Sequence, residues 1–538
     1  MSRLATPYVP RQPQETVLFG LVQEHLQDFF RHARESYDGP LPKYVKEEFR
    51  KYLECGDFSR GFVHVQCPAC GEDKAVAFSC KLRGLCPSCA GRRMAGSAAH
   101  LVDCVLPAAP LRQYVLAFPY ELSGLAATRP DVLRALSRIF WEALRRRYLR
   151  WAKRAGHATT RVETGAVTGV HRAGASLNVH VHLHVLCLDG VYVEAKDGTL
   201  RFEAAPTPSR EELQETLEYV YARVVKWLAR RGLLREADAS NEAPSYSVGE
   251  ALTLAGMQRG TLETARDTGE LAEPELAEPP PRVMDAAVHE RFNLHASVHL
   301  AAHDDLGRER LCRYLARPAF SLARFGVRRD GLVVYRVKNA GRGRVKQRVM
   351  TPVECLARLA AMVPPPRYPL LRLHGVLAPR HAWRAQVVPR PPESYAGCMK
   401  SSRKKDARGG DEPRRCGPLP AARVEPGAVP SLALAGLSIA PTAEIVRTSA
   451  LVATGVASRV APNILSIAHW ERLLGGELYA PLSRVDWATL LRRTFDIDVN
   501  NCCKCGGRMT VRAVVTDTAS IAKLLGALRR SRDPPVAA

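Results

Sequence analysis

The chain has 538 residues, of which 78 are lysine or arginine and 54 are aspartate or glutamate, so its formal net charge at pH 7 is +24. Its length allows roughly three or four domains of about 150 residues each, which excludes a small fold that depends on disulfides or metal ions for its stability. The charge favours a polyanionic partner, since each phosphate that a lysine or arginine neutralises releases a counterion. Charge alone does not distinguish DNA from RNA, and a merely basic surface is the alternative.

Hydropathy and cysteine usage indicate the compartment. We find no run of about 18 apolar residues, and the first residues lack the apolar core of a signal peptide, so no membrane partner is expected. We therefore expect a cytoplasmic, nucleoid-associated protein. In that reducing compartment the 15 cysteines favour metal binding over disulfides, because several form Cys-x-x-Cys pairs.

The first part of the chain is a mixture of predicted helices and strands. Apolar residues at intervals of three and four predict amphipathic helices over residues 16–55. A strand over residues 111–122 and a long helix over residues 131–155 follow. Residues 163–193 are typical of two strands joined by a turn near Arg172 to Ala175.

The second part predicts a helix over residues 213–234, then an acidic flexible insertion over about residues 235–281. A helix that contains Tyr314 should end near Pro318, because proline disfavours the helical conformation in the residue before it. Residues 331–339 and 344–350 should form paired strands. The expected divisions are residues 1–105, helical and zinc-binding; 106–385, the main mixed domain; 386–435, a basic disordered linker; and 436–538, a small C-terminal unit.

Two Cys-x-x-Cys knuckles separated by 15 residues predict a zinc site, because this spacing can bring four thiolates around one ion. The expected ligands are Cys67, Cys70, Cys86 and Cys89. Cys80 could replace one of them or serve as a spare thiol. Such a site is usually structural, and the neighbouring Arg92 and Arg93 make it a plausible DNA-contacting module.

Other cysteines give weaker signals. Cys502 and Cys505 flank a turn that resembles half a zinc ribbon, and they are a possible second metal site. No further knuckle follows them in the chain, so a cysteine-rich turn is the equal alternative. Cys55 and the remaining scattered cysteines are interpreted as free thiols or small core residues.

Histidines at positions 180, 182 and 184 alternate along a predicted strand, so all three should project from one face. Neutral imidazoles presented together are good ligands for a divalent ion, which can polarise a phosphodiester. Tyr314 lies on a predicted helix, with Arg310 and Arg317 about one turn on either side and Arg313 adjacent. These arginines could hold phosphates, although a tyrosine beside arginines is weak evidence without the histidines.

Five strings carry a family resemblance: ASLNVHVHLHVLCLDGVY, FSCKLRGLCPSCAGRRM, RERLCRYLARPAFS, PPPRYPLLRLHGVLAP and the ending IDVNNCCKCGGRM. In this order they resemble the IS91 and ISCR type of insertion-sequence transposase, from about Val17 to Val515. The resemblance implies an α+β fold like that of the HUH nucleases, a central antiparallel sheet flanked by helices, with an N-terminal helical zinc-binding domain and a small C-terminal cysteine-containing unit.

The resemblance also assigns roles. A His-hydrophobic-His motif that binds Mg or Mn corresponds to His182 and His184, and a helical tyrosine that attacks DNA corresponds to Tyr314. The third metal ligand stays open. It is His180, or else Glu163, which would lie opposite His184 if the strand pair turns near residues 173 and 174.

The implied activity is rolling-circle-type DNA transposition through a 5′-phosphotyrosine. Some relatives have a second tyrosine where this chain has Arg310, so a single-tyrosine mechanism is implied. The expected partners are single-stranded DNA at element ends and target, and the host replication machinery. A replication initiator or relaxase would use the same groups but lacks this zinc module. A non-catalytic zinc-dependent nucleic-acid-binding protein would not cleave oligonucleotides.

Overall fold

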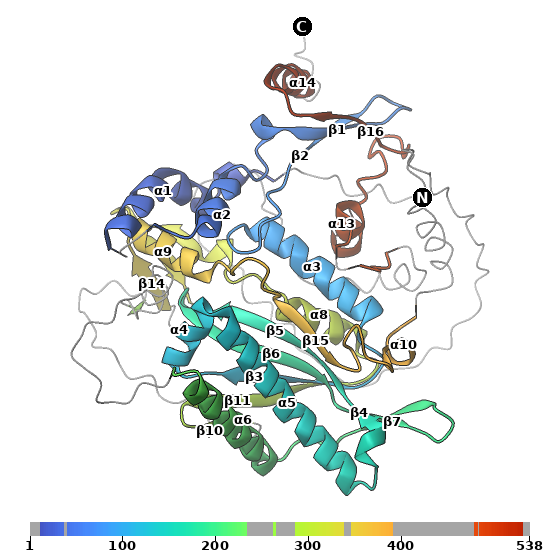
Figure 1. Cartoon of the computed structure of the whole chain (residues 1–538). Coiled ribbons are helices and arrows are strands. Elements are labelled where there is room, and N and C mark those ends of the chain that lie inside the picture. The colour runs from blue at the N-terminus through green and yellow to red at the C-terminus, as the bar shows by residue number, and fades with distance from the viewer. Residues whose placement is uncertain are drawn as a thin grey trace.

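The computed structural model describes residues 11–36, 40–233, 262–264, 286–337, 346–390 and 478–530, except residues 483 and 496. It is a mixture of helices and antiparallel sheets, as expected (Figure 1). Most of the acidic insertion expected at residues 235–281 and of the linker expected at 386–435 lies outside the described residues, as does the beginning of the C-terminal unit. No helix among the described residues is long and apolar enough to cross a membrane.

A six-stranded antiparallel sheet, in the order β10-β11-β3-β6-β5-β15, forms the centre of the molecule. Its strands are β3 (Leu111–Ala117), β5 (Gly165–Ala173), β6 (Val179–Leu188), β10 (Ala286–His289), β11 (Phe292–Leu300) and β15 (Leu371–Gly375). The strand expected at residues 111–122 is too long, because helix α4 begins at Tyr120, directly after Pro119. Proline disfavours the helical conformation of the residue before it, so it separates the strand from the helix.

The alternation of side chains along β6 divides the sheet into two faces. Val181, Leu183 and Val185 pack on one face in the core shared with α4 (Tyr120–Thr128), α5 (Pro130–Arg154) and α6 (Arg210–Arg230). Leu186 and Leu188 pack on the other face with α3 (Pro87–Cys104) and α8 (Asp305–Leu315). Side chains two residues apart on a strand share a face, so the even-numbered histidines of β6 lie on the α8 side.

Local signals set the helix ends. Ser209 and Thr351 accept hydrogen bonds from Glu212 N and Glu354 N, and so cap the first turns of α6 and α9 (Pro352–Met362). Asp304 caps α8 in the same way by accepting from Gly307 N. Helix α8 ends at Leu315, three residues before the proline that was expected to limit it.

The N-terminal and C-terminal parts of the chain share a small sheet. Helices α1 (Val17–Ser36) and α2 (Lys43–Leu53) confirm the periodicity of residues 16–55. The three-stranded sheet has the order β16-β1-β2, with β1 (Phe62–Gln66), β2 (Asp73–Ala77) and β16 (Thr510–Val515). Helices α13 (Trp487–Phe495) and α14 (Thr518–Arg530) flank β16 along the chain (Figure 1).

Two further antiparallel sheets lie at the periphery. One contains β4 (Val162–Glu163), β7 (Gly190–Glu194) and β8 (Leu200–Ala204). The other contains β9 (Leu262–Thr264), β12 (Phe325–Val327), β13 (Val333–Arg336) and β14 (Lys346–Met350). The pairing of β13 with β14 confirms the strand pair expected from residues 331–350. A short helix, α10 (Arg384–Val387), follows β15.

Candidate metal and tyrosine site

Three histidines meet where β5 and β6 pair. His171 of β5 lies opposite His182 of β6, and His184 follows two residues later on the same face. The ring centroid of His171 is 4.0 Å from that of His184 and 5.3 Å from that of His182. One ligand atom from each residue lies within 4.8 Å of the others, so the three side chains can hold a metal ion together.

The hydrogen bonds of the rings leave one nitrogen of each for a cation. His182 Nδ1 donates to the His180 carbonyl oxygen at 2.9 Å, and His171 Nε2 donates to the Leu315 carbonyl oxygen at 3.1 Å. Gln113 Nε2 lies 2.9 Å from His184 Nδ1. The amide oxygen and nitrogen have the same shape, and with the amide turned over its oxygen would accept from Nδ1–H and leave His184 Nε2 for a cation. Buried His171 Nδ1 and His184 Nε2 have no hydrogen-bond partner among the described residues.

Burial keeps these rings neutral. It lowers the pKa of His171 to about 3 and that of His182 to about 4, with the charges of neighbouring rings and of Arg317 adding to the effect. The pKa of His184 is lowered as well, chiefly by burial. At pH 7 the three lone pairs are therefore available for a metal ion.

Tyr314 lies on α8, next to this cluster. Its ring centroid is 5.3 Å from that of His184 and 5.6 Å from that of His171. The side chain is 36% exposed, so a substrate can reach it from outside. Gly169 of β5 permits the close approach, because a Cβ there would lie 2.6 Å from the Leu315 side chain and 2.8 Å from the Leu315 carbonyl oxygen.

The arginines around Tyr314 face in different directions. Arg310 is exposed, and Arg317 lies just past the end of α8 with its guanidinium carbon 4.3 Å from the centre of the Tyr314 ring. Arg313 is buried and donates to Glu309 at 3.0 Å. Arg313, which was expected to contact DNA, therefore points into the protein from α8.

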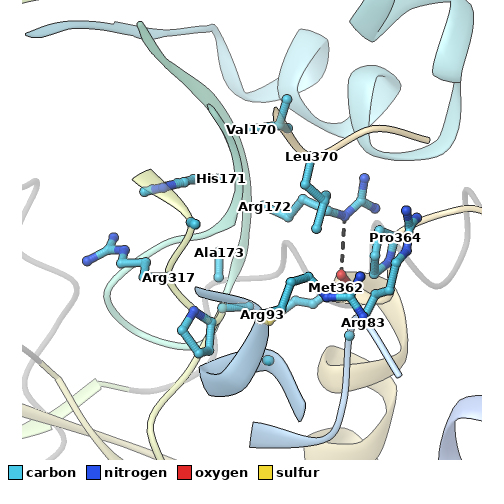
Figure 2. A pocket seen from close by; sticks show the side chains of 15 residues that line it. Arg83, Arg93, Val170, His171, Arg172, Ala173, Arg317, Met362, Pro364 and Leu370 are labelled. Atoms are coloured by element: carbon cyan, nitrogen blue, oxygen red, sulfur yellow. Dashed lines mark hydrogen bonds between the residues drawn. The ribbon is translucent and has the colours of Figure 1, made fainter. Parts of the chain in front are cut away.

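A basic hollow that is open to solvent lies beside the histidines (Figure 2). Arg83 and Arg93 line it from the segment around α3, Arg172 lines it from β5, and Arg317 lines it from the end of α8. His171 also lines it, so the hollow reaches the histidine cluster. None of the described residues that line the hollow is acidic, and an anion is the ligand that fits its charge.

The arginines of the hollow are held by backbone carbonyls. Arg93 donates to the Lys81 and Leu82 carbonyl oxygens at 3.0 and 3.2 Å. Arg172 donates to the Met362 carbonyl oxygen at 3.2 Å, and burial lowers its pKa to about 10. The expected DNA contact Arg92 is exposed and is not among the residues of the hollow.

Neither candidate for the third ligand joins the cluster. His184 lies opposite Gly169, whereas Glu163 pairs with Tyr192 in a separate sheet and accepts a hydrogen bond from Arg145 Nε at 2.8 Å. The expected register was wrong because the turn does not lie at residues 173 and 174. It spans Gly174 to Asn178, where Gly174 N donates to the Asn178 carbonyl oxygen at 2.8 Å.

His180 is next to the cluster but outside it. Its ring stacks on that of His182 with a centroid separation of 5.0 Å, and its carbonyl oxygen accepts a hydrogen bond from His182 Nδ1. His171, not considered as a ligand from the sequence, takes the third place. The missed signal is the Gly174–Asn178 turn, which sets His171 opposite His182.

The described cysteines form two clusters, each with a composition that differs from the expected one. Cys80, Cys86 and Cys89 meet Cys55, with all four sulfur atoms within 4.8 Å of one another. The Sγ atoms of Cys55 and Cys86 are 3.5 Å apart. Cys55 was interpreted as a free thiol or core residue, and Cys80 as a possible spare; both belong to a group that can hold a metal ion.

Cys67 and Cys70 meet Cys502 and Cys505 in the second cluster. The expected set that joined Cys67 and Cys70 to Cys86 and Cys89 is therefore wrong. The reason is the hairpin of β1 and β2, which places the first knuckle at its tip, while residues 80–89 continue from its base. The five residues of β2 span about 16 Å, which is the distance between the tip and the base of the hairpin.

Two family models match the chain. One, described as "Transposase zinc-binding domain", matches residues 21–118. These residues include Cys55, Cys80, Cys86 and Cys89, here called the Cys55 cluster, and the match supports a structural zinc ion. The other, described as "Putative transposase", matches residues 165–384, which include the three histidines and Tyr314. Comparison with curated proteins and with solved structures found no match.

Proposed function

Because the chain belongs to the IS91-type transposase family, we propose that it cleaves and rejoins single-stranded DNA in rolling-circle-type transposition, with Tyr314 as the nucleophile. The observation that carries the proposal is the position of Tyr314, whose ring lies 5.3 Å from His184 in a histidine cluster that can hold a metal ion. An antiparallel sheet with α8 across its histidine face agrees with an HUH nuclease-like fold.

The chemistry is a pair of balanced transfers. The Tyr314 oxygen attacks a phosphorus atom of one strand, the bond from phosphorus to the 3′ oxygen breaks, and the phenolic proton passes through solvent to that oxygen. The products are a tyrosyl 5′-phosphate and a free 3′-hydroxyl, which host enzymes can extend. A DNA 3′-hydroxyl later attacks the same phosphorus, and Tyr314 leaves and regains a proton. Each step exchanges one phosphate ester for another, so no ATP is required.

The neighbouring residues have separate tasks in this proposal. His171, His182 and His184 would hold a Mg or Mn ion, which polarises the phosphate and neutralises charge when bound. Arg317, which lies over the Tyr314 ring, is placed to contact the same phosphate. The basic hollow would hold the adjoining part of the strand. Arg310 occupies the position of a second tyrosine, so one nucleophile serves both steps.

The test is covalent trapping. Wild-type protein incubated with labelled single-stranded element ends and manganese should give an adduct that survives denaturing electrophoresis. Tyr314→Phe should give none, and Tyr219→Phe, which alters a tyrosine on the distant α6, should behave like the wild type. An adduct retained by Tyr314→Phe would refute the nucleophile. Binding without any cleavage by the wild type would favour a non-catalytic nucleic-acid-binding protein.

A further inference from the structure

Four cysteines from the two ends of the chain converge at the tip of the small sheet. Cys67 Sγ lies 3.5 Å from Cys505 Sγ, and Cys70 Sγ lies 3.5 Å from Cys502 Sγ, although 438 and 432 residues separate these partners. All four sulfur atoms lie within 4.8 Å of one another. Tetrahedral zinc with Zn–S bonds of about 2.3 Å places its sulfurs roughly 3.8 Å apart, so the arrangement has the size of a zinc site.

The two cysteine pairs sit on turns with the same hydrogen bonds. Cys67 O accepts from Gly71 N at 2.9 Å, and Cys502 O accepts from Gly506 N at 2.9 Å. Gly71 and Gly506 both have positive φ, 76° and 73°, as the close of such a turn requires. In the second turn Gly507 N also donates to Cys505 Sγ at 3.4 Å, a contact that stabilises a thiolate.

The strands behind the turns support the same pairing. β1 and β16 are antiparallel neighbours, with Gln66 opposite Thr510 directly beside the two knuckles. Gly507 leaves room for the sulfurs, because a Cβ there would lie 3.2 Å from Cys67 Sγ. Together the knuckles and strands make a zinc ribbon whose halves come from opposite ends of the chain.

The C-terminal residues that precede Cys502 and Cys505 also contact α8, the helix that carries Tyr314. Arg493 of α13 is 1% exposed and donates to Asp103 of α3 at 3.0 Å. The same guanidinium lies 3.4 Å from Glu309 of α8, the helix that carries Tyr314. The described C-terminal residues therefore contact the rest of the protein both at the cysteines beside β1 and, through Arg493, at α3 and α8.

We propose that Cys67, Cys70, Cys502 and Cys505 hold one structural zinc ion that clasps the two ends of the chain together. This ion is separate from the one held by the Cys55 cluster, so the protein binds two zinc ions. Cys67 and Cys70 lie within the matched zinc-binding domain, whereas Cys502 and Cys505 lie outside both matched parts of the chain. The proposal does not depend on the DNA chemistry.

The test is zinc per chain, measured by elemental analysis of the purified full-length protein. Wild type should contain two ions, and the pair variant Cys502→Ser/Cys505→Ser should contain one. The pair variant Cys67→Ser/Cys70→Ser should also contain one, and so should the variant with all four changes, because both pairs belong to one site. Cys503→Ser, in the same turn but outside the cluster, should keep two ions.

Other outcomes overturn the proposal. A single ion in the wild type, two ions in Cys502→Ser/Cys505→Ser, or fewer ions in the fourfold variant than in either pair variant would each contradict one shared site. Oxidised cysteines in place of zinc would show as missing thiols in a titration of the denatured wild type. If the serine variants fail to fold, Cys505→His provides the second test, because histidine can replace one cysteine ligand and two ions should remain.

Discussion

His171 and His180 differ in what they offer a cation, although both lie beside His182. His171 has a buried Nδ1 within the group of possible ligands, whereas His180 contributes its backbone carbonyl and a stacked ring. The position of a ring nitrogen, more than the presence of a histidine on the right face, therefore decides which residue is a ligand.

We predict that His171→Ala lowers metal-dependent cleavage of single-stranded oligonucleotides by at least ~100-fold, since loss of a ligand should cost as much as loss of its supporting partner or more. His180→Ala is the matched control and should stay within about tenfold of the wild type, because its carbonyl remains. Single-turnover rates at increasing manganese concentration measure both. Equal losses in the two variants would contradict the ligand set.

The approach of α8 to β5 positions Tyr314, and it depends on a glycine, which has no side chain, at position 169. Leu315, next to Tyr314, packs against Gly169 of β5, which lies opposite His184. Interiors are close-packed, so even one methyl group at this place must displace the end of α8. The geometry of the tyrosine relative to the histidines is thus set by the contact between a helix and a strand.

We predict that Gly169→Ala slows cleavage and lowers the free energy of unfolding by about 1–3 kcal/mol, because its Cβ overlaps with Leu315. Zinc content should not change, since the cysteines are untouched. Gly326→Ala is the control, because a Cβ there meets nothing within 4 Å. Cleavage rates and denaturant unfolding test the prediction, and wild-type values for Gly169→Ala would show that the contact does not position Tyr314.

The net charge of +24 is spread over the whole molecule, and it marks a particular binding place only where the fold brings arginines together. Arg83 and Arg93, from one segment, join Arg172 and Arg317, from two distant ones, and the four line one hollow that reaches His171. Such a concentration of positive charge beside the tyrosine favours a strand of DNA at this place over other parts of the basic surface.

We predict that binding of single-stranded DNA weakens as salt increases and that Arg93→Gln and Arg317→Gln each reduce the slope of log K against log salt by about 0.7, the value for one phosphate contact on a single strand. Fluorescence anisotropy in the Tyr314→Phe background measures binding without cleavage. Arg230→Gln, an exposed residue at the end of α6, is the control and should leave the slope unchanged. An unchanged slope in the first two variants would remove the hollow from the DNA path.

Local sequence patterns predict the features that depend on neighbours along the chain: the amphipathic helices, the strand that puts His182 and His184 on one face, the helix with Tyr314, and the presence of cysteine knuckles. Which distant residues complete each site depends on tertiary contacts. Because the turn spans Gly174–Asn178, His171 and not Glu163 lies in the histidine cluster. Because β16 pairs with β1, Cys67 and Cys70 lie beside Cys502 and Cys505. The physical reason is that strand register and contacts between chain ends arise from packing over hundreds of residues, which spacing within a motif does not encode.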